Sequence, residues 1–474
     1  MGYKRGRERD QLTLLPEAID DFVSETSYVR FIDSFVASFD LVKLEFKHAT
    51  PAETGRPAYD PADLLKLYIY GSMNRLNSSR QLAQACKCNV EVMWLLKRLQ
   101  PDFRTISDFR KDNPKPIRKL FVQFIRRLKA MGLVVGEMVG IDGSKFAGNN
   151  SKDNNYTAQK LEWLIERYTQ QMKRYLHRLE QNDSREKETP ALREQLQEQL
   201  EMARRRQDEK QRLLKQLGES NQKQISTVDP DSRRMKSGDG TVVGYNVQST
   251  VDAEHKLIVD VVATNSGNDS HELKNMTSRA KDILQQETLK ATADTGFYRA
   301  EEIAECEKDG IETYISKPRS GRTKLFNKTD FIYNKDENIY VCPAGEKLTF
   351  RGKLREHGRL LLRYEASVCQ QCPLRSKCTT LKKGNRRVTR FIDEDLLDKV
   401  QERTEAAPQI RTLRKAIVEH PFGTLKRRTN GRFLTRGLFK VDCEAVLMVI
   451  AYNLGRVFNI LSGNLPTPFS PARI

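Results

Sequence analysis

Strand-forming segments occupy only the middle of this chain, and their order constrains the fold more strongly than any other feature. β-Branched residues and glycines replace helix formers in five segments, which span residues 134–147, 244–251, 257–263, 290–295 and 312–315. Helical patterns at 270–286 and 300–309 separate the last three segments. The resulting order of strand, strand, strand, helix, strand, helix, strand predicts an α/β fold in which helices flank a sheet.

A long charged insert separates the first two strand segments. Apolar residues recur three or four positions apart over residues 158–180, the pattern breaks at 181–190, and leucines from 192 to 217 resume it. Lysine, arginine, glutamate and glutamine fill most other positions. We expect residues 157–226 to form an antiparallel helical hairpin, which could be a scaffold or dimerisation arm or only a solvated face.

The segment before the first strand carries helical patterns only. Pro61 stands where a helix can begin, residues 77–79 form a capping sequence, and a strongly basic helix follows over Pro116–Met131. Short helices joined by polar turns are typical of helix-turn-helix modules. An ordinary small helical bundle gives the same pattern, so the pattern alone predicts only a helical domain over residues 1–131.

The charge balance favours a polyanionic partner. The 82 lysines and arginines outnumber the 63 aspartates and glutamates, which gives a net charge of +19 and a pI near 9.5. Basic proteins bind DNA or RNA by neutralising phosphates and releasing counterions. A basic soluble protein without a nucleic-acid partner is the alternative that charge alone leaves open.

The composition argues against a membrane protein. The most apolar stretch, Ala445–Leu461, is interrupted by Asn453 and Arg456, and no stretch approaches ~20 apolar residues without charge. The first residues carry positive charges without an apolar segment after them, unlike a secretory signal. We therefore expect a cytoplasmic protein.

Four of the eight cysteines form a metal-binding pattern. Their spacing is C-x26-C-x2-C-x5-C, and they are Cys342, Cys369, Cys372 and Cys378. A CxxC pair can bind one side of a tetrahedral ion, and two further thiolates complete a closed structural Zn²⁺ site. An iron–sulfur cluster would use the same ligands, and unliganded thiols in a small β subdomain are the third reading. We expect residues 326–395 to form a zinc-ribbon-like insert.

Two aspartates mark the ends of strand segments. We expect the first strand to end at Asp142 and the fourth at Asp294, and a glycine-containing turn follows each. If these strands are neighbours in one sheet, both carboxylates point into one crevice. Carboxylates in this arrangement hold Mg²⁺, and a pair of ions about 3.5–4 Å apart supports attack on a phosphodiester. This chemistry needs a third acid.

The best candidate for the third acid lies near the C-terminus. Glu419 occupies a helical segment with many cations, and Lys426 lies two turns along the same face if the helix continues through Pro421. A cation at that position would meet phosphate. Glu444 is the competing acid, but a core-like apolar pattern surrounds it, so we favour Glu419.

These motifs together resemble bacterial insertion-sequence transposases of the DDE superfamily. The resemblance rests on IDGSKF around Asp142, ADTGF around Asp294 and VEHPFGTLKRR, in which Glu419 and Lys426 match the E-(6)-K signature. YDPADLLKLYIYG, TISDFRK, the four-cysteine pattern, RGLFKV and AYNLGRV add to it. The motifs cover about residues 30–460, and their order is more specific than any one of them.

The resemblance implies a fold. An RNase H-like mixed sheet would occupy residues 132–156 and 227–325, completed by C-terminal catalytic helices over 396–474. The helical domain 1–131 would bind DNA, and the helical hairpin and the four-cysteine segment would be inserts.

The resemblance also implies cut-and-paste DNA transposition by a homodimer on double-stranded DNA. Asp142, Asp294 and Glu419 would hold two Mg²⁺ ions, for which Mn²⁺ can substitute. Water would cut at the terminal inverted repeats, and the freed 3′-OH would attack target DNA. The candidate DNA-binding residues are all cations, namely Lys415, Lys426, Arg427, Arg428 and Arg80. The protein would be nucleoid-associated, with structural Zn²⁺ in the four-cysteine segment.

The chain departs from the wider signature Y-(2)-R-(3)-E-(6)-K. Counting back from Glu419 places Lys415 at the arginine position and Thr412 at the tyrosine position. Arg414 and Arg411 are each offset by one. Two further readings stay open: an Mg²⁺-dependent nuclease without strand transfer, and a non-catalytic DNA-binding protein derived from a transposase.

Overall fold

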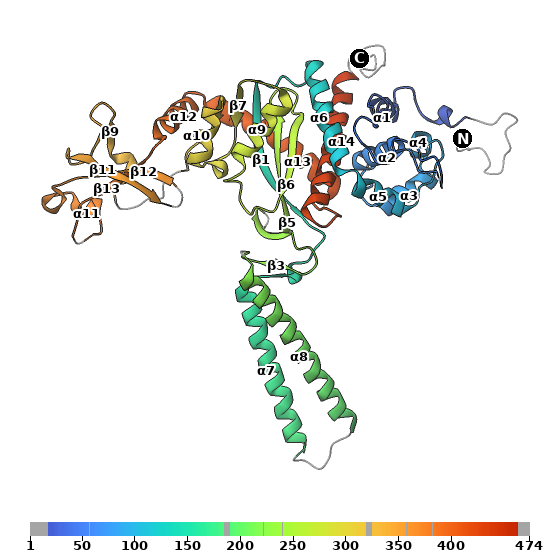
Figure 1. Ribbon diagram of the computed structural model, residues 1–474, viewed down its shortest axis with the longest axis horizontal. Coiled ribbons are helices and arrows are strands. Elements are labelled where there is room, and N and C mark those ends of the chain that lie inside the picture. Colours follow the sequence, from blue (N-terminus) through green and yellow to red (C-terminus); the bar gives the residue numbers. More distant parts are fainter. Residues whose placement is uncertain are drawn as a thin grey trace, which may run out of the picture.

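In the computed structural model, a central sheet flanked by helices lies between a group of N-terminal helices and a second, smaller sheet (Figure 1). The structure describes residues 18–55, 57–183, 190–220, 222–238, 240–318, 325–356, 359–381 and 383–462. The α/β class predicted from the sequence is confirmed. A pair of long helices projects away from the central sheet.

The central sheet contains both antiparallel and parallel pairs. Its strands are β1 (Met138–Ala147), β4 (Arg233–Ser237), β5 (Gly240–Asp252), β6 (Ile258–Thr264), β7 (Leu289–Thr292) and β8 (Ile311–Tyr314). The order is β4-β5-β1-β7-β8, and β6 also pairs with β5. β5 is antiparallel to β1, β4 and β6, whereas β1, β7 and β8 are parallel. Parallel neighbours end at the same edge of the sheet, which brings the residues after β7 close to β1.

The first strand is longer than the sequence predicted. β1 continues past Asp142, because its antiparallel ladder with β5 runs on to the pair Ala147–Gly244. Its parallel ladder with β7 is short and ends at Gly140–Thr292. The expectation that the strand ends at Asp142 is therefore wrong: Asp142 lies within β1, beyond the last pair shared with β7.

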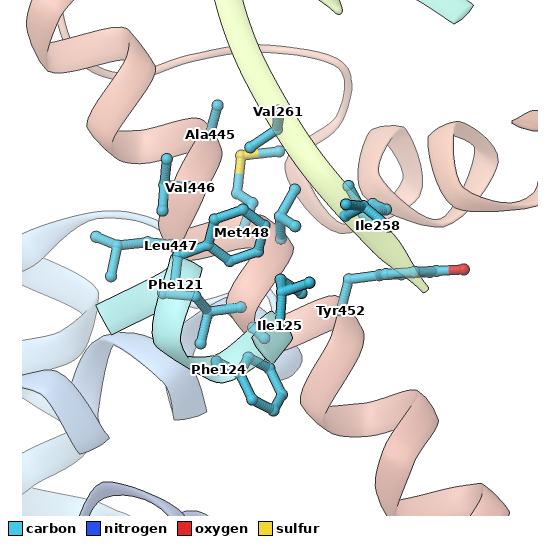
Figure 2. Close-up of a cluster of buried hydrophobic side chains, with 14 of the residues drawn as sticks. Phe121, Phe124, Ile125, Ile258, Val261, Ala445, Val446, Leu447, Met448 and Tyr452 are labelled. Atoms are coloured by element: carbon cyan, nitrogen blue, oxygen red, sulfur yellow. The ribbon is translucent and has the colours of Figure 1, made fainter. Parts of the chain in front are cut away.

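Helices pack against the central sheet and complete its core. They are α6 (Pro114–Ala130), α9 (Leu273–Leu284), α10 (Ala300–Lys308), α12 (Glu394–Ala406), α13 (Pro408–Thr429) and α14 (Leu438–Leu461). Figure 2 shows apolar side chains of α6 and α14 interlocking beside β6, with Phe121 and Met448 at the centre. Among the described residues, α14 is the one helix long and apolar enough to cross a membrane, and 72% of its most apolar window is buried within the protein. Protein packing accounts for its apolar surface.

The N-terminal helices continue the same core. They are α1 (Tyr28–Ala37), α2 (Pro61–Met73), α3 (Ser79–Cys88), α4 (Val90–Leu95) and α5 (Phe103–Asp112). Side-chain caps begin several of them: Asp60 accepts from Ala62 N–H, and Ser78 forms a capping box with Gln81. α2 packs on α14, and one buried apolar cluster runs from α1 through the sheet to α14.

The projecting arm is a helical hairpin. Its helices are α7 (Ala158–Asp183) and α8 (Pro190–Glu219), which pack along one another. The short strands β2 (Asn155–Tyr156) and β3 (Ile225–Ser226) pair at its base. A small apolar cluster at this base, built around Leu161 and Leu217, fixes the two helices where they leave the core.

The four-cysteine segment forms a separate antiparallel sheet with its own small core. Its strands are β9 (Ile332–Asn334), β10 (Ile339–Val341), β11 (Lys347–Glu356), β12 (Arg359–Glu365) and β13 (Arg387–Phe391). The helix α11 (Arg375–Cys378) follows the CxxC pair, and Leu348 and Tyr364 are fully buried in the core. Short 3₁₀ helices complete the fold at η1 (Ile19–Phe22), η2 (Lys152–Asn154), η3 (Thr295–Phe297), η4 (Lys328–Asp330) and η5 (Cys369–Gln371).

Candidate active site

Two of the three predicted acids come together at the edge of the central sheet. The last β1–β7 pair is Gly140–Thr292, and Asp142 and Asp294 each lie two residues further along their segments. Asp294 leaves the strand to cap η3, where its Oδ1 accepts from the Gly296 N–H at 2.8 Å. The parallel register thus carries both carboxylates to the same end of the same strand pair.

The Asp142 carboxylate is electrostatically unfavourable in its ionised form. Burial and, as the next largest cause, repulsion from Asp294 together raise the pKa of Asp142 to about 6. Arg414 on α13 opposes this shift, as does the hydrogen bond that Asp142 accepts from the Gly143 N–H at 2.9 Å. The two acids therefore lie close enough to repel each other, and the local positive charge does not offset that repulsion.

Helix α13 lies directly over β1 at this point. A Cβ atom on Gly140 would lie 2.8 Å from Val418 Cγ1, so only glycine allows the helix to approach this closely. Further along, the Phe146 ring packs near Phe422, with centroids 6.3 Å apart. Side chains alternate along a strand, so Asp142 shares a face with Gly140 and Phe146. It faces the turn of α13 that runs from Val418 to Phe422.

Glu419 belongs to that turn, but its side chain is exposed. The α13 side chain that acts on the pKa of Asp142 is Arg414, which lowers it. Over the described parts of the chain, no three His, Cys, Asp or Glu side chains are arranged as a metal site. The structure therefore brings Asp142 and Asp294 together and leaves Glu419 on the neighbouring surface.

Helix α13 continues without a break through Pro421 and reaches Thr429. Glu419 and Lys426 are seven residues apart and therefore share a face. The Lys426 ammonium lies 5.7 Å from the centre of the Phe146 ring, which holds it over the end of β1. The helix therefore continues through Pro421, as the shared face of Glu419 and Lys426 requires.

A fourth acid, Asp269, was missed by sequence reasoning. Its Oδ1 accepts hydrogen bonds of 2.6 Å from Asn246 Nδ2 and from Gln248 Nε2, and its Oδ2 lies 3.0 Å from Lys145 Nζ. Asp269 also contributes to the raised pKa of Asp142, after the larger effects of burial and of Asp294. A sequence signal existed, because Asp269 lies in the loop between a strand and a helix, as Asp294 does.

Asp269 approaches β1 from the face opposite to α13. A Cβ atom on Gly143 would lie 2.5 Å from Asp269 Oδ1, whereas the Cβ of Gly140 would meet α13. Positions 140 and 143 point to opposite faces of a strand. Gly143 therefore permits a carboxylate on the far side of the sheet to lie near Asp142.

Four of the five predicted DNA-binding cations lie on α13, and the fifth lies among the N-terminal helices. Lys415 and Arg427 are exposed on α13, whereas the Arg428 guanidinium is partly buried. Arg80 lies at the start of α3, where its guanidinium stacks 5.5 Å from the centre of the Phe103 ring. All but Arg80 belong to the helix that carries Glu419.

The four predicted zinc ligands line one small cavity of about 30 Å³ in the module β9–β13. Burial raises the pKa of the Cys378 thiol, and proximity to Cys369, Cys342 and Cys372 contributes to the increase. The Arg386 N–H donates to Cys369 Sγ at 3.3 Å. The thiols thus face one another, although in the described chain they are not drawn together into a formed ligand set.

Comparison with known protein families gives two matches. Residues 17–112 match a family described as a transposase domain (DUF772), and residues 341–458 match a family described as a transposase DDE domain. The second match contains Glu419 and the four cysteines, whereas Asp142 and Asp294 lie outside both. No match was found among curated proteins.

One solved structure is similar to the chain over most of its length. It is a cryo-EM structure of a piggyBac transposase synaptic complex with hairpin DNA. The similarity covers 93% of this chain and 81% of the other, at 8% identity and a TM-score of 0.25.

Proposed function

We propose that the chain is a DDE-type transposase, as the two matched segments support, and that it cleaves and joins DNA at the ends of an insertion sequence. The substrate would be the terminal inverted repeats, and the route would be cut-and-paste transposition. The observation that carries the proposal is the pair Asp142 and Asp294, held at one end of neighbouring parallel strands.

The strand order supports an RNase H-like assignment. Three antiparallel strands, β6, β5 and β1, are followed by the parallel strands β7 and β8. This arrangement is consistent with the mixed sheet that the resemblance implied, and the hairpin α7–α8 comes between β1 and β5 in the chain. The first acid lies on the central strand of the sheet and the second after its parallel neighbour.

The acid pair fits a divalent cation. Asp142 and Asp294 supply hard oxygen ligands, and their mutual repulsion falls when positive charge lies between them. Glu419 would complete the set from α13, on a turn that faces Asp142. When bound, two Mg²⁺ ions supply Lewis acidity and neutralise charge that develops on the phosphate.

The protein's own groups then position DNA for two in-line displacements. In the first, water adds to phosphorus, the bond to the 3′ oxygen breaks and a 3′-OH is released. In the second, that 3′-OH attacks a target phosphodiester and displaces another 3′ oxygen. Lys426 would hold a phosphate on the Glu419 face, and the N-terminal helices would bind the inverted repeat.

Strand cleavage and strand transfer, measured separately, test this function. A labelled duplex carrying the inverted repeat should be nicked at its end in Mg²⁺ or Mn²⁺, and a precut end should join to plasmid DNA. Asp294→Asn should abolish both reactions and leave end binding intact. Cleavage without joining would identify a nuclease instead. Binding without either reaction would identify a non-catalytic derivative.

We propose Zn²⁺ as the ion held by the four thiols. Native mass spectrometry should find one zinc per chain, and Cys372→Ser should lose it. Loss of zinc should raise amide hydrogen exchange in β9–β13 while the central sheet stays protected, because the module has a core of its own. A zinc-free protein with full protection of β9–β13 would contradict the assignment.

A further inference from the structure

A cavity of about 420 Å³ lies on the side of α13 away from the acid pair. It opens between the N-terminal helices α1 and α2 and the C-terminal helices α13 and α14, which lie close together in Figure 1. Its main polar lining residues are Tyr28, Asn74, His420, Arg427, Arg428 and Arg456. We call it the junction cavity.

Positive charge in the junction cavity is not compensated. It is lined by Arg427, Arg428 and Arg456, and no carboxylate is among its lining residues. None of these three arginines has an ion-pair partner within the described residues. The nearby Lys256 adds to the charge, since it lowers the pKa of His420 together with burial and the arginines. An anion is the chemical complement of such a site.

Arg428 is the least satisfied of these groups. Its Nη1 is buried and has no hydrogen-bond partner. Burial lowers the pKa of its guanidinium, and repulsion from Arg427 and Arg75 adds to the effect. A buried guanidinium with an unpaired N–H is destabilising unless an acceptor reaches it. The fold therefore maintains Arg428 in a position that only a further acceptor would satisfy.

The surrounding groups are held in place by backbone contacts. Arg456 Nε donates to the His255 carbonyl at 2.7 Å, and its side chain also hydrogen-bonds Tyr452, so the guanidinium is fixed at the cavity wall. The Tyr452 hydroxyl donates to the Lys256 carbonyl at 3.1 Å and lies 3.2 Å from His420 Nδ1. Donors fixed before binding lose little conformational entropy when the ligand arrives.

Contacts at and beside the cavity join the N-terminal helices to α13 and α14. A Cβ atom on Gly455 would lie 3.3 Å from Met73 Cε, which is a tight contact, and in ordinary contact with Arg428 Nη2 at 3.5 Å. Asn77, from the N-terminal helices, donates to the Arg428 carbonyl at 2.9 Å. A ligand in the junction cavity would therefore contact both the N-terminal part and α13.

We propose that the junction cavity binds a backbone phosphate of the DNA on which the enzyme acts. The inference rests on the proposed function and adds a phosphate site that the acids and Lys426 do not provide. His420, Thr424 and Arg428 repeat every four residues along α13 and share one face, whereas Glu419 and Lys426 occupy another. DNA phosphates would thus contact two faces of α13, the helix that carries the proposed third acid, Glu419.

Anion-dependent stability tests the site without any catalytic readout. The melting temperature of the full-length protein is compared in sodium phosphate and in sodium chloride at equal ionic strength. Phosphate should raise it by about 2–4 °C in the wild type and not in Arg428→Met. In chloride, Arg428→Met should be at least as stable as the wild type, because an unsatisfied buried charge is removed. An equal phosphate effect in both proteins, no effect in either, or a destabilised variant would overturn the proposal.

DNA affinity provides the second arm. Arg428→Met should weaken binding of an inverted-repeat duplex about tenfold and reduce the slope of log K against log salt by about 1. Arg355→Met is the matched control, since it removes one positive charge from an exposed position on β11. Equal losses in the two variants would show a net-charge effect only and would overturn the proposal. Arg428→Lys should recover part of the affinity.

The two proposals can fail independently. If Asp294→Asn abolishes cleavage while Arg428→Met binds DNA and phosphate like the wild type, the junction cavity is not a phosphate site and the transposase function stands. If Arg428→Met loses phosphate and DNA binding while the wild type never cleaves DNA, the junction cavity is a phosphate site and the transposase function fails.

Discussion

Helix α13 separates two sites whose charges are unbalanced in opposite directions. On the side facing β1, Asp142 and Asp294 repel each other, with Asp269 nearby. On the other side, Arg427, Arg428 and Arg456 surround the junction cavity without a carboxylate. The acid pair has excess negative charge and the junction cavity has excess positive charge, and α13 lies between them. The difference matches the two ligands proposed above, cations at the sheet and phosphate at the junction cavity.

The largest expected effect concerns the acid side. Asp294→Asn should reduce cleavage by at least about 1,000-fold, because one ligand of the proposed cation site loses its charge while its shape is kept. Duplex binding should change less than about threefold. Gel-based cleavage and fluorescence anisotropy on the same preparation separate the two. If cleavage survives in Asp294→Asn, the acid side is not the reaction site.

The raised pKa of Asp142 predicts a pH-dependent stability difference. A folded-state pKa of about 6 exceeds the ordinary value of 3.8, so the folded protein binds this proton more tightly than the unfolded chain. The associated stability is present below about pH 4 and is lost as the pH rises through 6. At pH 7, Asp142→Asn should therefore be about 2–3 kcal/mol more stable than the wild type in metal-free buffer.

Urea denaturation at pH 4 and pH 7 measures this difference, and Mg²⁺ sharpens it. Added Mg²⁺ should stabilise the wild type at pH 7 and leave Asp142→Asn nearly unchanged. The difference in the free energy of unfolding between the two proteins should therefore become smaller. A gap that does not depend on pH would mean that Asp142 is not the titrating group. A gap that Mg²⁺ leaves untouched would mean that the acid pair does not hold the cation.

Arg414 and Lys415 provide a matched pair one residue apart on α13. Arg414 lowers the pKa of Asp142, whereas Lys415 is exposed. Arg414→Met should shift the acidic limb of the cleavage-rate profile to higher pH and slow cleavage about tenfold at pH 6. Lys415→Met should leave that limb in place. The opposite result would assign the signature arginine's role to Lys415, as simple counting along the sequence suggests.

Asp269 should have the smallest effect. Asp269→Asn removes a negative charge near Asp142, so the acidic limb should move slightly to lower pH. The variant also weakens the contacts that hold Lys145 and Gln248, and cleavage at pH 8 should fall about three- to fivefold. A loss as large as that of Asp294→Asn would instead place Asp269 among the ligands of the cation.

The sequence predicted the elements better than their contacts. Strand and helix patterns located β5, β6, α9 and α10 within a few residues, because period and capping are local properties. The end of β1 was missed because it depends on the ladder with β5, whose partner residues lie about 100 positions away. Asp142 and Asp294 were selected as acids near the ends of strand patterns, although β1 runs on past Asp142 and β7 ends two residues before Asp294. Only the register of β1 against β7 brings the two acids together.

The rest of the candidate site depends on tertiary approach. Nothing local distinguishes Asp269 from other loop acids, since its partners Asn246 and Gln248 come from a neighbouring strand. Arg428 was selected only as one cation in a basic run. It loses solvent because it packs beside Gly455 of α14. Sequence spacing selects candidate residues, whereas tertiary packing determines which of those residues become buried.

The core shared by α2, α6 and α14 has a further consequence for how this protein can be divided. Because α14 meets the length and composition of a membrane span, it depends on its neighbours to keep its apolar faces from water. A fragment that begins after residue 131 would lack α2 and α6 and would leave those faces uncovered. Such a fragment should aggregate or partition into detergent micelles. The N-terminal helices thus shield the apolar faces of α14 from water. A fragment that contains α14 should therefore also contain the N-terminal helices from α1 onward.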